Sequence, residues 1–284
     1  MDQTIEKIAL AAQAKAAGLR RDPLGFLVLS MLAGVYVGFG IVLIFAIGAP
    51  LAAAGSPLTK ALMGAAFGVA LSLVIFAGSE LFTGNHLFLT LGTLVGRSRL
   101  LDLALVWGWC FLGNLVGSLL LAWLVVQAGV FGADPQRSFV LQIAATKMTL
   151  PFWTLFVRGI LCNWLVCLAV WMAQRTQSEA ARLVLIFWCL FAFIGAGFEH
   201  SVANMSLLGI ALFLPHDAAV SWSGYVANLV PVTLGNIVGG AGCVAGLYWL
   251  ASPLKRLAQA GSPAPVEPAR ALQATLPVAG TEPA

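Results

Sequence analysis

Charged residues are scarce in this chain. Asp, Glu, Lys and Arg make up 9% of its 284 residues, whereas hydrophobic residues make up 60%. Soluble domains carry about 25% charged residues, so the composition excludes an ordinary soluble domain and indicates a protein that crosses a membrane several times. The net charge of +4 is spread over several loops and forms no dense basic patch, which argues against nucleic acid as a partner.

Clusters of metal-ligating residues are lacking too. The five cysteines stand within apolar segments at none of the spacings typical of a zinc site. A haem held between membrane helices usually needs paired histidines, and only one of the three histidines, His200, is clearly expected at membrane depth. We therefore expect no metal, no cofactor and no enzymatic activity.

Apolar runs of transmembrane length dominate what is present. Together they predict an all-α polytopic membrane protein with six transmembrane helices, of which the second and fifth are broken. Four runs are continuous, at about 24–51, 103–129, 152–173 and 226–251, and two are interrupted, at 61–96 and 183–214.

The basic residues indicate the orientation of these helices. All fifteen Lys and Arg residues fall on one side of the membrane except Lys60, Arg137, Lys147 and Arg158. The positive-inside rule then places both termini in the cytoplasm.

Three regions follow along the chain. Residues 1–22 have apolar side chains at three- and four-residue spacings, which predicts an amphipathic helix at the cytoplasmic surface. Residues 23–252 form the transmembrane domain. The segment 253–284 is rich in Pro and Ala, cannot bury a core, and is expected to be a disordered cytoplasmic tail.

The pattern Gly-x-Glu-x4-Asn occurs once in each interrupted run. The two copies are Gly78, Glu80 and Asn85, and Gly197, Glu199 and Asn204. A helix break at membrane depth survives only where it is buried in protein or lines a cavity. Two such breaks in corresponding places are a pointer to a transport site.

A second repeat supports an internal duplication. GNLVGS at 113–118 returns as GNIVGG at 235–240, at nearly the offset that separates the two Gly-x-Glu-x4-Asn copies. Each half, at about 23–130 and 150–252, would hold three crossings. An odd number predicts two inverted three-helix repeats, an arrangement found in many transporters.

The polar residues of the broken segments suggest two kinds of role. Glu80 and Glu199 could accept hydrogen bonds from exposed backbone N–H groups and hold the breaks together, with Asn85 and Asn204 as structural neighbours. A short helix is expected to begin near His86, to which we assign no role. Both half-helix N-termini would aim partial positive charge at the membrane centre.

His200 is the leading candidate for chemistry. Histidine alone titrates near neutrality without perturbation, so a buried histidine beside a permeation path can exchange a proton with a weak acid. The alternative is a neutral histidine that bonds two helices. Asn163 needs a partner such as His200 or Thr83, and Lys147 would attract anions if the segment 131–151 folds over the outer mouth.

At these residues the chain resembles the formate/nitrite transporter family. The motifs are SELFTGN at 79–85, LCNWLVCLAVWM at 161–172 and GFEHSVANM at 197–205, and the RRDPLGF sequence at 20–26 is most similar to the bacterial nitrite channels. The resemblance implies a homopentamer in which each protomer has an aquaporin-like fold and its own pore for small monovalent anions.

The resemblance also implies roles for single residues. Thr83 and His200 are expected at the pore centre, Asn163 positions the histidine, and Lys147 lines the periplasmic vestibule. Apolar constrictions are expected at Phe67, Leu71, Phe193 and Phe82.

Nitrite is the expected substrate, with proton exchange at His200. Formate and hydrosulfide are alternatives within the family, and simple anion conduction is an alternative to proton exchange. A neutral-solute channel of aquaporin type is a further alternative, although Asn-Pro-Ala is absent from both breaks.

Overall fold

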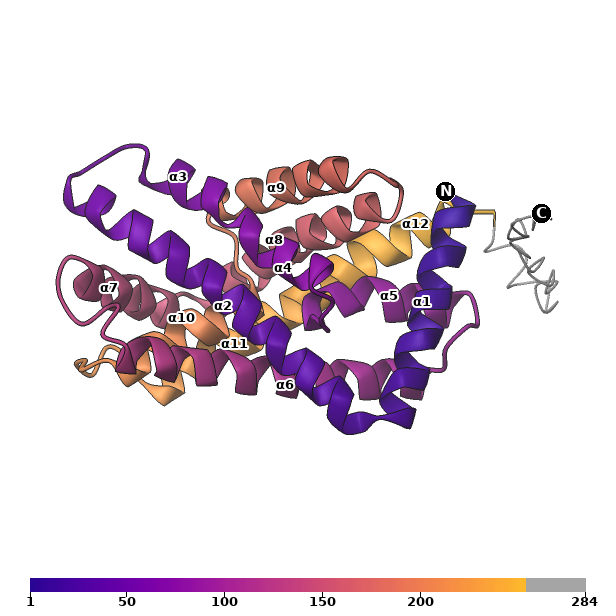
Figure 1. Cartoon of the computed structure of the whole chain (residues 1–284), viewed down its shortest axis with the longest axis horizontal. Helices are drawn as coiled ribbons and strands as arrows, with labels where there is room; N and C mark the ends of the chain where they lie inside the picture. Colours follow the sequence, from indigo (N-terminus) through magenta and orange to yellow (C-terminus); the bar gives the residue numbers. More distant parts are fainter. Residues whose placement is uncertain (254–284) are drawn as a thin grey trace, which may run out of the picture.

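The computed structural model describes residues 1–253, which form helices with no strand among them (Figure 1). The expected disordered tail lies outside the described residues, apart from its first residue. The elements are α1 (Asp2–Arg21), α2 (Pro23–Ala53), α3 (Thr59–Ala66), α4 (Gly68–Phe76), α5 (Phe82–Leu94), α6 (Leu100–Gln127), α7 (Gln136–Thr149), α8 (Phe152–Ala173), α9 (Glu179–Ala196), α10 (Ser201–Phe213), α11 (Trp222–Ile237), a π-helical segment (Val238–Gly246) and α12 (Leu247–Leu250).

Six spans in the described part are long and apolar enough to cross a membrane. They are α2, α3 with α4, α6, α8, α9, and the run from α11 through α12. This confirms the six predicted crossings. The opposed orientation of the two halves stays a prediction.

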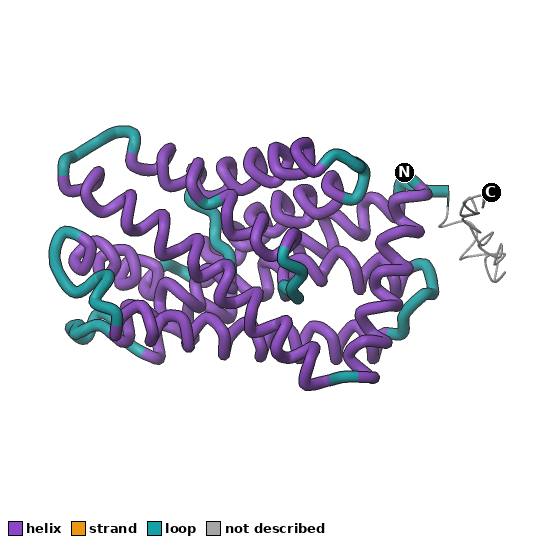
Figure 2. Tube along the Cα trace, viewed as in Figure 1, coloured by secondary structure: helices purple, strands orange, loops and turns teal. Residues whose placement is uncertain are grey.

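The second and fifth crossings are each completed by a separate short helix, α5 and α10. Figure 2 shows the two connecting loops inside the helical body, away from its ends. Gly78 and Gly197 both adopt positive φ, +74° and +76°, which lets the chain leave each half-helix at once. Leu81 is extended and α5 begins at Phe82, so the expected start near His86 was wrong.

α1 lies across the ends of the other helices at one end of the molecule (Figure 1). Its apolar face is buried, and three ion pairs join it to the rest of the chain. The amphipathic pattern of residues 1–22 therefore reflects docking on protein. The pairs are Lys15–Glu80, Arg20–Asp102 and Glu6–Arg97.

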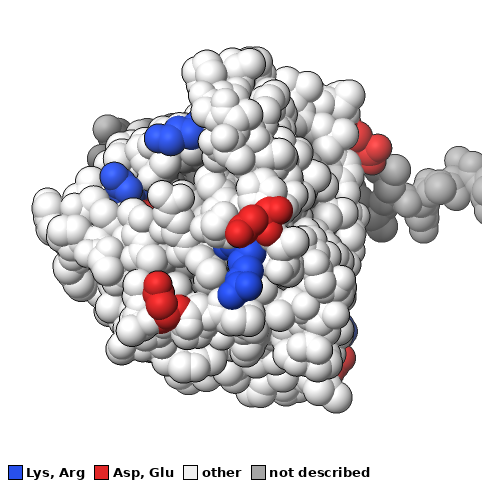
Figure 3. All heavy atoms as spheres, turned by 90° about the vertical axis from the view of Figure 1, so that its left-hand side faces the viewer, with Lys and Arg blue, Asp and Glu red and all other residues white. Residues whose placement is uncertain are grey.

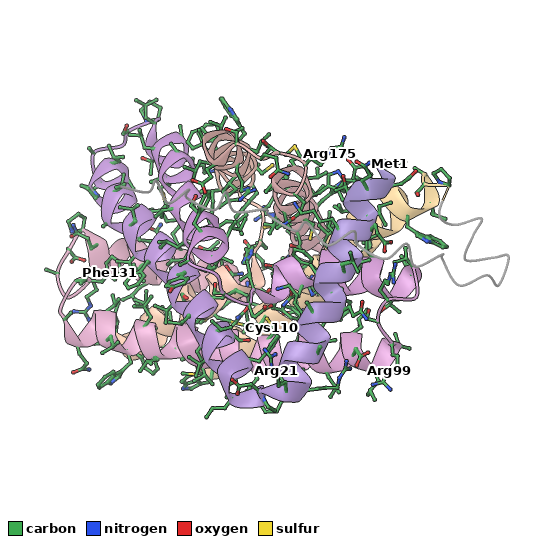
Figure 4. All side chains as sticks on the ribbon, turned by 45° about the vertical axis from the view of Figure 1, so that its right-hand side comes forward. Met1, Arg21, Arg99, Cys110, Phe131 and Arg175 are labelled. Carbon is green, nitrogen blue, oxygen red and sulfur yellow. The ribbon has the colours of Figure 1, made fainter. Side chains whose placement is uncertain are left out.

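Figure 4 gives the two ends of the molecule. Met1, Arg99 and Arg175 lie toward one end, and Phe131 lies at the other. Arg99 and Arg175 thus lie toward the same end as Met1, and the orientation of this end in the membrane stays a prediction.

Close helix packing uses the glycines of the repeated GN motifs. Gly117 on α6 lies against the backbone of Met31 on α2, and Gly239 lies against the backbone of Ile160 on α8. A Cβ at either glycine would collide with main-chain atoms. These small residues therefore bring helices together within one chain.

Candidate functional site

Asn114 of α6 holds the break in the second crossing. Its Oδ1 accepts from the Phe82 N–H at 2.9 Å, and its Nδ2 donates to the carbonyls of Glu80 at 2.9 Å and Ser30 at 2.7 Å. Asn114 is fully buried. One amide thus satisfies three main-chain groups in a region where water is not available to do so.

Asn236 repeats this arrangement at the other break. Its Oδ1 accepts from the Ser201 N–H at 2.8 Å, and its Nδ2 donates to the carbonyls of Glu199 at 2.9 Å and Gly159 at 2.8 Å. The backbone contacts that we expected of the two glutamates are therefore made by two asparagines. They stand in the repeated GN motifs, where we expected Asn114 and Asn236 to tie helices together, and each one does bond main-chain groups of other helices.

The Glu199 carboxylate faces a lysine and an amide. Lys147 Nζ lies 2.6 Å from its Oε2 and 2.7 Å from its Oε1, and Asn204 Nδ2 donates to Oε2 at 2.7 Å. The side chain of Glu199 is 3% exposed and that of Lys147 19%. α7 does lie at the end of the molecule opposite α1, as expected of a segment that folds over the outer mouth. Lys147, however, is an ion-pair partner and not a lone ammonium.

Glu80 has the matching environment at the other break. Lys15 Nζ lies 2.6 Å from Glu80 Oε2, to which Asn85 Nδ2 also donates, at 2.9 Å. The lysine comes from α1, a helix outside the six crossings. The sequence analysis used Lys15 only as evidence for topology and missed this contact.

Thr83 and His200 meet between the two breaks. Thr83 Oγ1 is 3.1 Å from His200 Nε2, and both residues are buried. The Ala203 N–H donates to His200 Nδ1 at 3.2 Å, so this nitrogen carries a lone pair and caps α10. The ring proton is then on Nε2, where it points at the threonine hydroxyl.

Aromatic side chains surround this central pair. The rings of Phe67 and Phe193 meet edge to face with centroids 5.6 Å apart, and the Phe193 ring stacks on His200 at 6.0 Å. A cavity of about 10 Å³ is lined by these three residues and Leu71. This is the size of about one water molecule, so the passage is narrow here.

Phe82 is oriented differently from the other predicted constriction residues. Its ring packs against His86 at 4.4 Å and Phe111 at 5.1 Å. His86 belongs to α5 and Phe111 to α6, so the Phe82 ring is packed where these two helices meet. Both contacts are edge to face, a favourable geometry for aromatic rings.

A cavity of about 580 Å³ opens at the end of the molecule where α7 lies; we call it the α7-side cavity. It reaches inward to Phe193 and His200 and is lined further out by Lys60 and Lys147. Figure 3 shows this end, where a few charged side chains, among them an acidic and a basic group in contact, stand on an otherwise uncharged surface. Lys60 is exposed and takes part in no ion pair within residues 1–253.

A second cavity, of about 250 Å³, opens beside α1; we call it the α1-side cavity. Its lining includes Lys15, Leu71, Glu80 and Asn85. Leu71 therefore lines both this cavity and the small central one. Two wide cavities thus approach one small apolar cavity, which is lined by His200, the partner of Thr83.

Asn163 of α8 lies behind the central pair. Its Nδ2 is 3.2 Å from the Thr83 carbonyl, 2.7 Å from the Asn236 carbonyl and 2.9 Å from His86 Nδ1. Its hydrogen bonds within the described residues thus include Thr83 but not His200. His86, to which the sequence analysis gave no role, is fully buried at this point.

Comparisons with known proteins agree with this architecture. The family model described as "Formate/nitrite transporter" matches residues 2–250. The chain is similar to the nitrite transporter NirC of Escherichia coli (strain K12), with 46% identity over 250 residues, which are 88% of this chain and 92% of that protein.

Two solved structures are similar to most of this chain. One, titled "FNT family ion channel", has a TM-score of 0.85 and 45% identity and covers 89% of this chain and 100% of that one. The other, "Pentameric formate channel with formate bound", has a TM-score of 0.73 and 30% identity, with 82% and 98% covered.

Proposed function

Because this chain belongs to the formate/nitrite transporter family, a family of transporters and not of enzymes, we propose that it is a membrane channel for nitrite. The relative named a nitrite transporter, which is 46% identical over most of both chains, supports nitrite. One structural observation carries the proposal. The Thr83–His200 pair lies at a narrow apolar passage between two wide cavities.

A small anion that enters this passage loses most of its hydrating water and finds few hydrogen-bond donors in exchange. At the centre these are the hydroxyl of Thr83 and the Nε2–H of His200. The N-termini of α5 and α10 both begin at this level and add partial positive charge. An anion of a few atoms can be held there, whereas the Phe67 and Phe193 rings restrict larger solutes.

Nitrite crosses the rings as nitrous acid in this proposal. Moving an anion into an apolar passage costs several kcal/mol even after relaxation. Protonating a weak acid whose pKa lies three to four units below ambient pH costs only about 4 to 5 kcal/mol. Since the idealised penalty for an unrelaxed site is of order 20 kcal/mol, neutralisation can win wherever the passage relaxes little around the ion.

His200 is the proposed site of this proton exchange, and the geometry sets the order of events. Nδ1 already accepts from Ala203, so the ring first takes a proton at Nδ1 from solvent in the α7-side cavity, which His200 and Ala203 line, and gives up that hydrogen bond. Nε2 then releases its proton to nitrite. Taking a proton back at Nε2 and releasing the one at Nδ1 restores the cap.

The assembly and the location belong to the same proposal. A homopentamer is supported by the similar structure titled as a pentameric formate channel. For a protein with six apolar spans and bacterial relatives, we propose the bacterial inner membrane, with α1 and both termini in the cytoplasm. The α1-side cavity then opens to the cytoplasm and the α7-side cavity to the periplasm.

Uptake by reconstituted vesicles tests the function. Nitrite, formate, hydrosulfide, chloride and glycerol are compared at one pH, with protein-free vesicles as the blank. Fastest protein-dependent uptake of nitrite is the expected result. Preferential uptake of formate or hydrosulfide would assign another substrate of this family, and glycerol uptake would indicate a neutral-solute channel.

A further inference from the structure

His86 is a buried histidine beside the proposed pore. It is fully buried on α5, where its ring meets Phe82 at 4.4 Å and Trp107 at 4.7 Å, both edge to face. Its Nδ1 lies 2.9 Å from Asn163 Nδ2, and its Nε2 has no hydrogen-bond partner among the described residues.

The contact with Asn163 has one chemical reading. An amide nitrogen has no lone pair to offer, so Nδ1 accepts and the ring proton is on Nε2. The two amide protons of Asn163 are shared among three acceptors: the Asn236 carbonyl at 2.7 Å and, on α5, His86 Nδ1 at 2.9 Å and the Thr83 carbonyl at 3.2 Å. Thr83 and His86 stand about one turn apart on the same face of the helix.

Two points of attachment fix the rotation of a helix about its axis. Asn114 holds the start of α5 at the Phe82 N–H, and Asn163 contacts the next residue, Thr83, through its carbonyl. The contact with His86 adds a point of attachment one turn further along the helix. Thr83 lies in the first helical turn of α5, so the orientation of the turn also sets the direction of the Thr83 hydroxyl toward His200 Nε2.

The break before α10 forms without a contact of the Asn163–His86 kind, so such a contact is not required for a helix break. The residues that stand 119 positions after Thr83 and His86 are Val202 and Met205, both buried and apolar. A side chain such as methionine at position 86 would also avoid burying Nε2 without a partner. Within residues 1–253, the polar link thus stands beside the half-helix that carries the pore hydroxyl, and apolar side chains take the corresponding positions at the other break.

We propose that His86 is a positioning residue which, through Asn163, holds the Thr83 hydroxyl opposite His200. The inference rests on the proposed function for its transport readout, since only a substrate-binding Thr83 makes the position matter to flux. Its geometry can be tested without any substrate.

The first test compares variants by nitrite uptake. His86→Leu removes the acceptor, His86→Gln keeps the size but moves the polar group away from Nδ1, and His86→Asn keeps an acceptor near the place of Nδ1. We expect Leu and Gln to raise KM for nitrite about tenfold and Asn to stay within about threefold of wild type. Met205→Leu is the matched control at the other break and should be unchanged.

The second test asks whether His86 acts through Thr83. In a Thr83→Val background the hydroxyl is gone, so His86→Leu should cause no further loss of uptake. Equal losses in both backgrounds would overturn the proposal, as would an Asn variant as impaired as the Leu variant. If wild type carries another anion, the same series is measured with that anion.

Nitrogen NMR of histidine-labelled protein in nanodiscs supplies the substrate-free readout. The His200 Nε2–H signal should move in His86→Leu as it does in Thr83→Val, and stay in Met205→Leu. A His200 signal unchanged by His86→Leu would overturn the positioning role. If nitrite uptake is absent but the NMR signals shift as expected, the proposed substrate is contradicted and the positioning role of His86 is not.

Discussion

Lys147 is bound to Glu199 through both carboxylate oxygens, with Nζ 2.6 Å from Oε2 and 2.7 Å from Oε1. The pair joins α7 to the break before α10. Because the two charges largely cancel at a distance, the pair contributes less to the potential of the α7-side cavity than a single ammonium would. Its nearer effect is to hold the break in place through Asn204, which shares the same carboxylate.

Replacing Lys147 alone should destabilise the protein more than replacing Lys147 and Glu199 together. Lys147→Met leaves a carboxylate that is 3% exposed without its counter-ion, with an expected cost of about 2 to 4 kcal/mol. The double variant Lys147→Met/Glu199→Gln has no unpaired charge and should regain most of this stability. Thermal unfolding in detergent measures both; a double variant as unstable as the sum of the singles would contradict the assignment.

Lys60 is expected to attract anions to the α7-side cavity. It is exposed, lines that cavity and has no ion-pair partner within the described residues. Lys60→Gln should raise KM for nitrite about threefold at low salt, and the effect should fade near 1 M salt, where the Debye length is about 3 Å. Arg137→Gln, whose arginine donates to the Pro215 carbonyl, is the control. A salt-independent loss would point to folding instead.

Asn236→Ala should be among the most damaging single substitutions. It removes three hydrogen bonds to main-chain groups around the fifth crossing, with an expected loss of about 3 kcal/mol or more. Leu234→Ala, at an exposed position on the same helix, is the control. Comparable thermal unfolding midpoints for the two variants would show that the amide does not hold the break.

Phe193→Ala should widen the central passage. The ring contacts both Phe67 and His200, so its removal enlarges the cavity of about 10 Å³. Acetate and other larger weak acids should then enter vesicles at measurable rates, while wild type excludes them. Trp188→Ala, an exposed position on α9, should keep the wild-type selectivity. If acetate stays excluded from Phe193→Ala vesicles, the narrowest point lies elsewhere.

The sequence predicts well whatever the bilayer itself demands. The apolar spans and the two breaks at Gly78 and Gly197 follow from length, hydropathy and an interrupted pattern. The repeated GN motifs marked Asn114 and Asn236 as equivalent, and both turn out to make the same three main-chain contacts. An internal repeat can be found in a single sequence because it does not require knowing which helices contact one another.

Contacts that depend on how separate helices dock could not be predicted in this way. Nothing in the sequence of α1 shows that Lys15 reaches Glu80, because the two residues belong to elements whose packing is not periodic in the chain. The direction of Phe82 depends on the rings of His86 and Phe111. The start of α5 depends on Asn114, 32 residues beyond Phe82.

Nitrite-dependent proton entry is the measurement that tests the central claim most directly. Proteoliposomes with an internal pH indicator receive nitrite across an external pH series, with wild type, His200→Asn and protein-free vesicles compared. Asparagine can still accept from the Ala203 N–H as a cap but cannot exchange a proton. We predict that wild type acidifies the lumen faster as external pH falls and that His200→Asn drops to the protein-free rate. Proton entry at the wild-type rate in His200→Asn would contradict proton exchange at this histidine.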